Sequence, residues 1–383
     1  MNKLTFTAAV FTIVLQSCAQ QTEKKENKTK EDPKVTYHPA INHSFTINDF
    51  LGDNKQLDKD VDSIFKTLSD ETKVAQLLMP AVGRLGETNE LITQKIKENK
   101  IGGVLMLNGT KEEFTNWIKA YNELNPYKNN LPFLYSADAE PSLVNRKITG
   151  STPVIKANEM KTIDEVRKYT NIISKDLNDI GINYNFSPVV DMSPNKTVGF
   201  RSFGAIPENI IPWSNAFIQE TQKNGIIATA KHFPGHGLVS GDTHKALQMI
   251  DGELKEIKNY PKLIQDGVLS IMVAHIAVKN NEKYDTKGLP STLSPEIVTN
   301  LLRNEYNFKG LIVTDAMNMG GVSSIPNAEI KAIEAGIDII LMPLNVDKAY
   351  NSLLKKYTED KSFKSKVDIA SKRIIRMKLC IKK

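Results

Sequence analysis

The chain has 383 residues, with 50 Lys and Arg, 44 Asp and Glu, two Cys and 40% hydrophobic residues. This composition excludes a disulfide scaffold, a collagen-like chain and a mostly disordered protein. The net charge of +6 originates in the last 29 residues, where eleven basic residues stand against three acidic ones. Residues 1–354 therefore sum to −2. We expect no nucleic-acid binding, because an excess confined to a short tail is typical of a solvated helix face or a membrane-facing patch.

The start of the chain predicts a secretory signal with a lipid attachment site. Lys3 is followed by a twelve-residue apolar run, residues 4–15, which is too short to span a bilayer as a lasting helix. The ending Leu-Gln-Ser-Cys18 resembles the bacterial lipobox, in which the cysteine is lipidated after cleavage. We expect a signal peptide at 1–17 and a lipoprotein anchored through Cys18 in the cell envelope, on its periplasmic or cell-surface face. An ordinary signal with a chance cysteine is the alternative.

Residues 18–45 predict a disordered tether, and residues 46–383 a single folded domain. The tether is polar, mixed in charge and nearly free of large apolar side chains, so it cannot bury enough surface to fold. The rest has no obvious internal linker, and its length suits one large α/β domain better than two. We expect a monomer.

Eight short apolar runs rich in β-branched residues recur along this domain. Their starts are 25 to 51 residues apart, which leaves room for a helix between each pair and predicts parallel strands. Helix signals fit this pattern: Thr162 and Glu165 form a capping-box pattern, and Gly181 is a stop signal. The prediction is an α/β fold of the (β/α)8 TIM-barrel type, with an open doubly wound sheet as the alternative. The runs are 76–82, 101–107, 131–138, 182–191, 226–233, 269–275, 310–316 and 337–343.

Polar side chains stand where five of these runs stop. In a barrel, these are the C-terminal strand ends, where side chains from different strands converge and active sites are built. One such residue is often a strand cap, but capping alone does not explain five of eight. The residues are Asp138, Asp191, Lys231 with His232, His275, and Thr314 with Asp315.

Four of the six histidines, His232, His236, His244 and His275, lie within 44 residues. Such a cluster suits either a metal site or proton transfer together with carboxylates. The H-x-H pattern is absent and the candidate acidic partners lie on different loops. We therefore favour proton transfer, and expect neither a metal nor another cofactor.

Residues 231–244 read KHFPGHGLVSGDTH. This segment resembles the K-H-F-x-G-H-G and D-[ST]-H motifs of glycoside hydrolase family 3, in its β-N-acetylhexosaminidase branch. Six further segments resemble the family in the same order along the chain. They are residues 68–79, 138–146, 185–191, 201–204, 291–322 and 332–342.

The resemblance implies that residues 46–383 are a catalytic barrel that acts on carbohydrate. Hydrolysis with retention needs an attacking carboxylate and a separate proton donor. The resemblance assigns these roles to Asp315 as nucleophile and to His244 with Asp242 as acid/base pair. Imidazole titrates near neutral pH and can give and take a proton. This pair favours a retaining exo-β-N-acetylglucosaminidase, acting on peptidoglycan fragments or chitin-like oligosaccharides, over a β-glucosidase.

The other polar strand ends would hold the sugar. The glycines around His236 are consistent with a mobile loop, and His236 itself is expected to hold that loop by hydrogen bonds. By resemblance, the substrate-binding residues are Asp138, Arg146, Arg201, Lys231 and His232. The residues expected behind them are Asp191, His236 and His275.

The loop after Asp138 departs from the family pattern. Pro141 and Ser142 replace two glycines, and Leu143 replaces a commonly basic residue. Because proline fixes its backbone angle, this loop either follows a different path or never needed glycine. Two alternatives remain open: a glycoside phosphorylase, since a histidine acid/base leaves room for an anionic nucleophile, and a catalytically silent sugar-binding lipoprotein. Since both catalytic elements are present, we favour an active enzyme.

Overall fold

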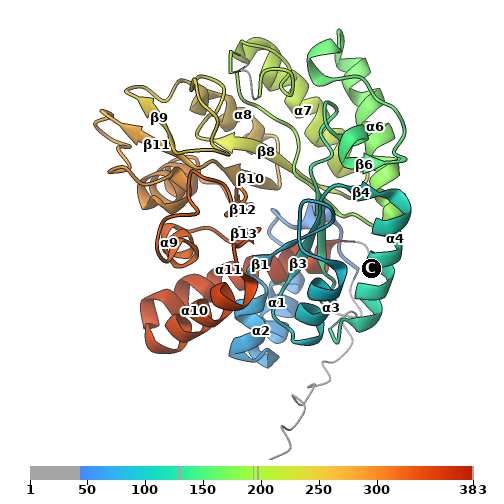
Figure 1. The fold of residues 1–383 in the computed structure, drawn as a ribbon, viewed down its shortest axis with the longest axis vertical. Coiled ribbons are helices and arrows are strands. Elements are labelled where there is room, and N and C mark those ends of the chain that lie inside the picture. Colours follow the sequence, from blue (N-terminus) through green and yellow to red (C-terminus); the bar gives the residue numbers. More distant parts are fainter. Residues whose placement is uncertain (1–43, 128–130, 193, 196–197, 382–383) are drawn as a thin grey trace, which may run out of the picture. The chain divides into compact units, whose positions relative to one another are not determined.

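The computed structural model describes residues 44–127, 131–192, 194–195 and 198–381 (Figure 1). The predicted signal peptide, the lipidation site at Cys18 and nearly all of the predicted tether lie outside these residues. The described residues all fall within one compact unit that spans residues 37–383. No helix in this described part is both long and apolar enough to cross a membrane.

Each of the eight predicted apolar runs contains a strand, and the strands pair in parallel as their spacing predicted. Seven strands form one sheet in the order β12-β10-β8-β7-β5-β3-β2, and β1 pairs with β13. The bounds are β1 (Leu78–Met79), β2 (Ala81–Val82), β3 (Gly103–Met106), β5 (Leu134–Ala137), β7 (Tyr184–Asn185), β8 (Ile227–Phe233), β10 (Ser270–Val273), β12 (Leu311–Thr314) and β13 (Ile340–Leu341). The chain therefore has an α/β fold built on parallel strands.

Proline shortens two of the predicted strands. Pro80 divides the first run into β1 and β2, since it has no N–H to donate to a neighbouring strand. The run at 182–191 contributes only the two residues of β7, and Pro188 lies in its remainder. Beyond it, Val189 continues through isolated bridges to Ser202 and Lys231.

The helices lie around the strands (Figure 1). In α6, Thr162 accepts a hydrogen bond from the backbone N of Glu165, and Gly181 ends the helix at φ 96°. The Glu165 carboxylate, however, accepts from the backbone N of Lys161, so the predicted capping box is only half formed. The longer helices are α1 (Lys55–Thr67), α3 (Asn89–Lys97), α4 (Lys111–Leu124), α6 (Ile163–Ile180), α7 (Pro207–Lys223), α9 (Ala328–Ala335), α10 (Val346–Glu359) and α11 (Lys361–Cys380), with a π-helical segment at Glu296–Glu305. The shorter ones are α2 (Asp70–Ala75), α5 (Val144–Lys147) and α8 (Tyr260–Gln265).

Several basic residues of the C-terminal segment contact acidic residues of the same fold. Lys372 pairs with Asp62 of α1 at 2.7 Å, and Arg373 pairs with the buried Asp338. Lys378 is buried, and its Nζ donates to Gln76 Oε1 and to the Gly102 carbonyl, each at 2.7 Å. Part of the positive charge of this segment is thus paired with acidic residues within the domain.

Candidate active site

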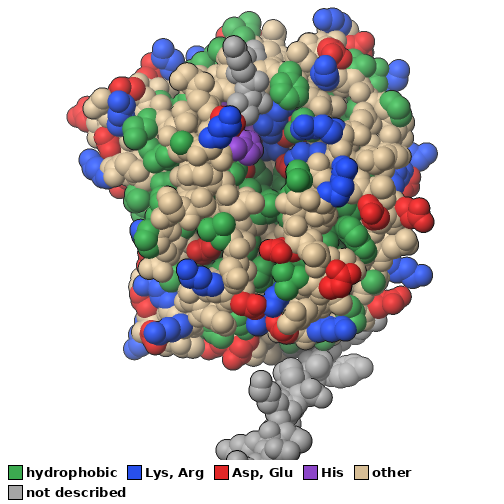
Figure 2. Space-filling model, viewed as in Figure 1, with side chains coloured by type: hydrophobic (Ala, Val, Ile, Leu, Met, Phe, Trp, Pro, Cys, Tyr) green, Lys and Arg blue, Asp and Glu red, His purple; other side chains and the backbone are tan. Residues whose placement is uncertain are grey.

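A pocket of about 420 Å³ lies at the C-terminal ends of the strands. In Figure 2 it is the hollow in the displayed face, with a histidine and several Lys or Arg side chains at its edge. Its apolar wall includes Leu105 of β3, Met272 of β10 and Leu341 of β13. Its charged and ionisable lining residues are Asp138, Arg146, Lys147, Arg201, Lys231, His232, His244 and Asp315. The tertiary fold therefore brings together charged side chains that are up to 177 positions apart.

Asp315 follows directly after β12, whose four residues are all buried. One carboxylate oxygen, Oδ1, accepts a hydrogen bond from the backbone N of Ala316 at 2.8 Å. Burial raises the pKa of Asp315, but the electrostatic influence of His232 and His275 and the Ala316 hydrogen bond outweigh it, so the pKa lies below its ordinary value. A rigidly mounted, ionised carboxylate at this position can act as a nucleophile.

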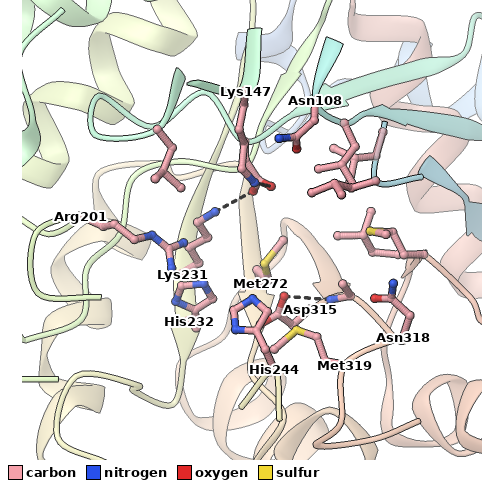
Figure 3. Close-up of a pocket in the computed structure, with 18 of the residues that line it drawn as sticks. Asn108, Lys147, Arg201, Lys231, His232, His244, Met272, Asp315, Asn318 and Met319 are labelled. Atoms are coloured by element: carbon pink, nitrogen blue, oxygen red, sulfur yellow. Dashed lines mark hydrogen bonds and ion pairs between the residues drawn. The ribbon is translucent and has the colours of Figure 1, made fainter. Parts of the chain in front are cut away.

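His244 and Asp242 form a hydrogen-bonded pair at the edge of the same pocket. His244 Nδ1 donates to Asp242 Oδ1 at 2.8 Å, and the backbone N of His244 donates to the same oxygen at 3.0 Å. Burial raises the pKa of Asp242, but these two hydrogen bonds from His244 more than compensate, and the net pKa is lowered. With Nδ1 held by an ionised carboxylate, Nε2 is the nitrogen left to exchange a proton with a ligand. His244 and Asp315 both line the pocket, and Figure 3 shows the two side chains there.

The loop that carries His244 is attached to the segment after Asp315. The backbone N of Gly320 donates to the His244 carbonyl at 3.0 Å, and the N of Gly321 donates to the Thr243 carbonyl at 3.2 Å. A Cβ at position 320 would lie 2.3 Å from the Lys245 carbonyl oxygen, so only glycine permits this approach. The end of the loop that carries His244 is therefore bonded to the segment after Asp315. The glycines from which we predicted a mobile loop lie in its earlier part, around His236.

Glu256 lies under the first part of the same loop. Its carboxylate accepts hydrogen bonds from three backbone N–H groups, those of Met192 at 2.6 Å, Gly237 at 3.2 Å and Leu238 at 3.3 Å. Burial and the charge of Asp191 raise the pKa of Glu256 to about 8, against the lowering effect of the three donors. No sequence motif points to Glu256, which lies twelve residues after His244 and outside every segment that resembles the family.

Asp138, Lys231 and Arg201 lie close together, linked by a residue that sequence analysis missed. Glu140 accepts two hydrogen bonds from Arg201, at 2.8 and 2.7 Å, and pairs with Lys231 at 2.6 Å. Lys231 also donates to Asp138 Oδ1 at 2.9 Å. Glu140 is fully buried and stands two residues after Asp138, so a carboxylate inside the third-strand motif was the available signal.

The carboxylates in this group are ionised. Burial raises the pKa of Glu140, but Arg201 and Lys231 bring it down to about 2. Burial likewise raises the pKa of Asp138, and Lys147 and Lys231 lower it far below its ordinary value. The group can therefore orient hydroxyls through charge-assisted hydrogen bonds.

Arg146 lines the pocket, but its side chain is exposed, and among the described residues none forms a hydrogen bond with it. The neighbouring Lys147 instead donates to Asp138 Oδ2 at 2.5 Å. The family pattern indicates Arg146, and it gives no signal for Lys147.

Asp191 lies behind His232 and links it to the loop. Its Oδ2 accepts from His232 Nδ1 at 2.6 Å, and its Oδ1 accepts from the backbone N of His236 at 2.9 Å. His236 Nε2 contacts Thr243 Oγ1 at 2.8 Å, next to the acid/base candidate. His275 is buried and contacts Thr292 Oγ1 at 2.8 Å. None of the three, Asp191, His236 or His275, is among the residues that line the pocket.

The altered third-strand loop is held by the residues that replace glycine. Ser142 Oγ donates to the Phe200 carbonyl at 2.7 Å and accepts from the backbone N of Ala157 at 2.9 Å. Pro141 is buried. Glu140 remains bonded to Arg201, so the substitutions leave this part of the pocket assembled. Within the described part of the chain, no group of three or more His, Cys, Asp or Glu is arranged to hold a metal ion.

Comparisons with known proteins identify the family of this chain. Residues 69–377 match the model described as "Glycosyl hydrolase family 3 N terminal domain". A curated "Beta-hexosaminidase A" of Pseudoalteromonas piscicida is 30% identical over 285 residues, which cover 67% of this chain and 48% of that protein. The chain thus spans about half the length of this relative and of a second one, from Cellulomonas fimi.

Two solved structures are similar over most of this chain. A glycoside hydrolase family 3 β-N-acetylglucosaminidase from Paenibacillus sp. str. FPU-7 is 28% identical with a TM-score of 0.74, covering 82% of this chain and 62% of that one. A β-N-acetylhexosaminidase from Beutenbergia cavernae is 25% identical with a TM-score of 0.73, covering 81% and 98%.

Proposed function

Because this chain belongs to glycosyl hydrolase family 3, we propose that it is a retaining exo-β-N-acetylglucosaminidase that removes terminal N-acetyl-β-hexosaminides from peptidoglycan fragments or chitin-like oligosaccharides. The observation that carries this proposal is that Asp315 and the His244–Asp242 pair border the same pocket. The names of the relatives from Pseudoalteromonas, Paenibacillus and Beutenbergia support the same activity.

The proposed reaction has two displacement steps. Asp315 attacks the anomeric carbon while His244 Nε2 gives a proton to the leaving oxygen, so the glycosidic bond breaks as an ester to Asp315 forms. His244 then takes a proton from water, whose oxygen attacks the same carbon and releases the carboxylate. Asp242 holds the imidazole orientation and stabilises its charged form in both steps.

The test is hydrolysis of an aryl N-acetyl-β-glucosaminide by the full chain. We expect wild type to release the β-anomer first, and Asp315→Ala to lose at least about a thousandfold in kcat, since it lacks the nucleophile. Asp179→Asn, which removes an exposed carboxylate of α6, is the matched control. Equal, slow release by wild type and Asp315→Ala would contradict the proposal.

Three further arms separate the alternatives. Faster turnover of the aryl glucoside would favour a β-glucosidase, and turnover only in phosphate buffer would favour a phosphorylase. Binding of the sugar without any product would favour a silent sugar-binding lipoprotein.

The proposal also includes a closed (β/α)8 barrel at residues 46–383. It is supported by β13 standing between β1 and β12. The backbone N of Ile340 donates to the Leu77 carbonyl at 2.8 Å, and that of Thr314 donates to the Ile339 carbonyl at 3.0 Å. The backbone N of Leu105 in β3 donates to the carbonyl of Pro80, between β1 and β2, at 2.8 Å.

We further propose that residues 1–17 are removed, that Cys18 carries the lipid, and that residues 18–45 tether a monomeric enzyme to the periplasmic or cell-surface face of the envelope. The lipobox-like ending supports this. Fractionation tests it: wild type is expected in the membrane fraction, and Cys18→Ala in the soluble fraction. A Cys18→Ala protein that stays with the membrane would argue against a lipid anchor.

A further inference from the structure

Five charged side chains of alternating sign form a continuous row along one side of the pocket. Lys147 contacts Asp138 at 2.5 Å, Asp138 contacts Lys231 at 2.9 Å, and Lys231 contacts Glu140 at 2.6 Å. Glu140 then contacts Arg201 at 2.7 Å. Figure 3 shows the three cations of the row, Lys147, Lys231 and Arg201, around the same side of the pocket. With three positive and two negative charges, the row has a net charge of +1.

The row is closed to solvent at its centre and open at the Lys147 end. The side chains of Lys231 and Glu140 are 2% and 0% exposed, whereas those of Asp138 and Lys147 are each 17% exposed. Both Asp138 and Lys147 line the pocket. A sugar that enters therefore meets the Asp138–Lys147 pair in front of the buried Lys231 and Glu140.

This pair has unused hydrogen-bonding capacity. An ammonium group has three donors, and Lys147 uses one of them on Asp138. Each carboxylate oxygen of Asp138 accepts from one lysine and can accept one more hydrogen bond. Two donors and two acceptor positions thus remain. Two neighbouring sugar hydroxyls, each of which donates and accepts, match this set.

The contact with Asp138 distinguishes Lys147 from its neighbour Arg146. Both belong to α5, a single helical turn, both line the pocket, and the backbone N of each donates to the Leu143 carbonyl at 3.0 Å. Only Lys147 has its Nζ on Asp138, at 2.5 Å, and its side chain is partly buried there. The side chain of Arg146 is exposed.

We propose that Lys147 is a substrate-binding residue that, together with Asp138, binds a pair of neighbouring hydroxyls on the terminal sugar. This proposal rests on the proposed glycosidase function and adds to it a donor that the sequence motifs did not indicate. Lys147 supplies hydrogen bonds to the sugar, and also keeps the Asp138 carboxylate ionised and oriented.

The test compares wild type with Lys147→Met and Lys147→Arg on an aryl N-acetyl-β-glucosaminide and on its 3-, 4- and 6-deoxy analogues. We expect Lys147→Met to lower kcat/KM on the parent about 10- to 100-fold, the effect of losing charge-assisted hydrogen bonds. On the analogue that lacks a bound hydroxyl, the loss should shrink to less than about threefold, because the lost partner is absent there already. Lys147→Arg, which keeps the charge, should recover part of the activity.

Two matched variants separate binding from a general charge effect. Arg146→Met removes a neighbouring positive charge from the same rim, and should cost less than Lys147→Met. Lys156→Met removes an exposed lysine that pairs with Glu159 and lies outside the pocket lining, and should behave as wild type. Thermal unfolding of each variant checks that it is folded, and Lys147→Gln, which also removes the charge, serves in place of Lys147→Met if the latter unfolds.

An equal loss on the parent and on all three deoxy analogues would overturn the proposal, because Lys147 would then act only through Asp138. A loss no larger than that of Arg146→Met would overturn it as well. If wild type turns over none of the glycosides, the glycosidase proposal fails separately. Lys147 is then tested by titrating N-acetylglucosamine into wild type and Lys147→Met, where unchanged affinity counts against it and weakened affinity supports it.

Discussion

At the scale of single residues, the protonation of each ionisable group in the pocket depends on the residues that contact it. Asp315 is ionised because nearby imidazoles and a backbone N–H outweigh its burial. His244 has a defined free nitrogen because Asp242 occupies the other one. Glu140 stays charged in a fully buried position because Arg201 and Lys231 both contact it. The protonation of each of these three side chains therefore depends on the residues that contact it in the folded chain.

Lys378 gives a prediction for the pH dependence of stability. Burial lowers its pKa to about 7, whereas an unfolded lysine titrates near about 10.4. Between these values the unfolded chain binds a proton that the native state does not, so this group makes the native state more stable as pH rises from about 7 to 10. The slope is at most about 1.4 kcal/mol per pH unit.

Urea unfolding of wild type and Lys378→Met at pH 7, 8 and 9 measures this. We expect the free energy of unfolding of wild type to rise with pH relative to that of the variant. Lys372→Met, which removes a half-exposed lysine of the same helix, should show no such difference. If the difference in the free energy of unfolding between wild type and Lys378→Met did not change from pH 7 to 9, burial would not lower the pKa of Lys378.

At the scale of elements, loops held by distant backbone contacts position the proposed acid/base residue. The loop that carries His244 contacts the segment after β12 through Gly320 and Gly321. Glu256 fixes its beginning and also binds Met192, in the segment after β7. Three segments of the chain thus meet at one buried carboxylate.

Removing that carboxylate should release the loop. In Glu256→Ala, the N–H groups of Met192, Gly237 and Leu238 lose their common acceptor, so we expect kcat to fall at least about tenfold. Amide hydrogen exchange at Gly237 and Leu238 should become faster. Leaving a buried N–H group unpaired costs about 1–3 kcal/mol, and three groups are affected, so thermal unfolding of the variant must show that it is still folded before its kcat is compared.

Glu253→Ala is the control, because it removes an exposed glutamate three residues earlier. If the exchange rates of the loop amides were the same in Glu256→Ala and wild type, Glu256 would not be what holds the loop.

At the scale of the whole molecule, the two ends of the described domain are joined. Arg376 of α11 donates to the carbonyls of Phe50 at 2.7 Å and Gly52 at 2.6 Å, and it pairs with Asp58 of α1. Ile47 and Phe50 are buried against this region. The segment from residue 46 to 53 therefore belongs to the folded domain, although it precedes the first long helix.

Two truncations test this boundary. A protein that starts at residue 46 should keep the melting temperature and the activity of the full chain after signal removal. One that starts at residue 54 loses two buried apolar side chains and three acceptors of Arg376, so its melting temperature should fall by several degrees. If the two truncated proteins had the same melting temperature, residues 46–53 would not be part of the folded domain.

The sequence was sufficient to predict several local features. Hydrophobic runs with regular spacing predicted the parallel strands, because a buried strand needs continuous apolar side chains and a parallel connection needs a helix. The family motifs indicated Asp138, Arg201, Lys231, His232, His244 and Asp315, and the structure brings all of them to one pocket. Prolines limited the strand lengths where their missing N–H interrupts the hydrogen-bond ladder.

Which side chains contact one another was decided only by the tertiary structure. Arg146 and Lys147 are adjacent and both basic, and only the folded structure shows that Lys147 is the one that reaches Asp138. Glu256 bonds to backbone amides as far as 64 residues away, which leaves no local pattern. Lys372 and Arg376 of the basic C-terminal helix pair with acidic residues more than 300 positions earlier. Composition and motifs determine which groups are available, whereas the pairing of charges depends on distances that exist only once the chain is folded.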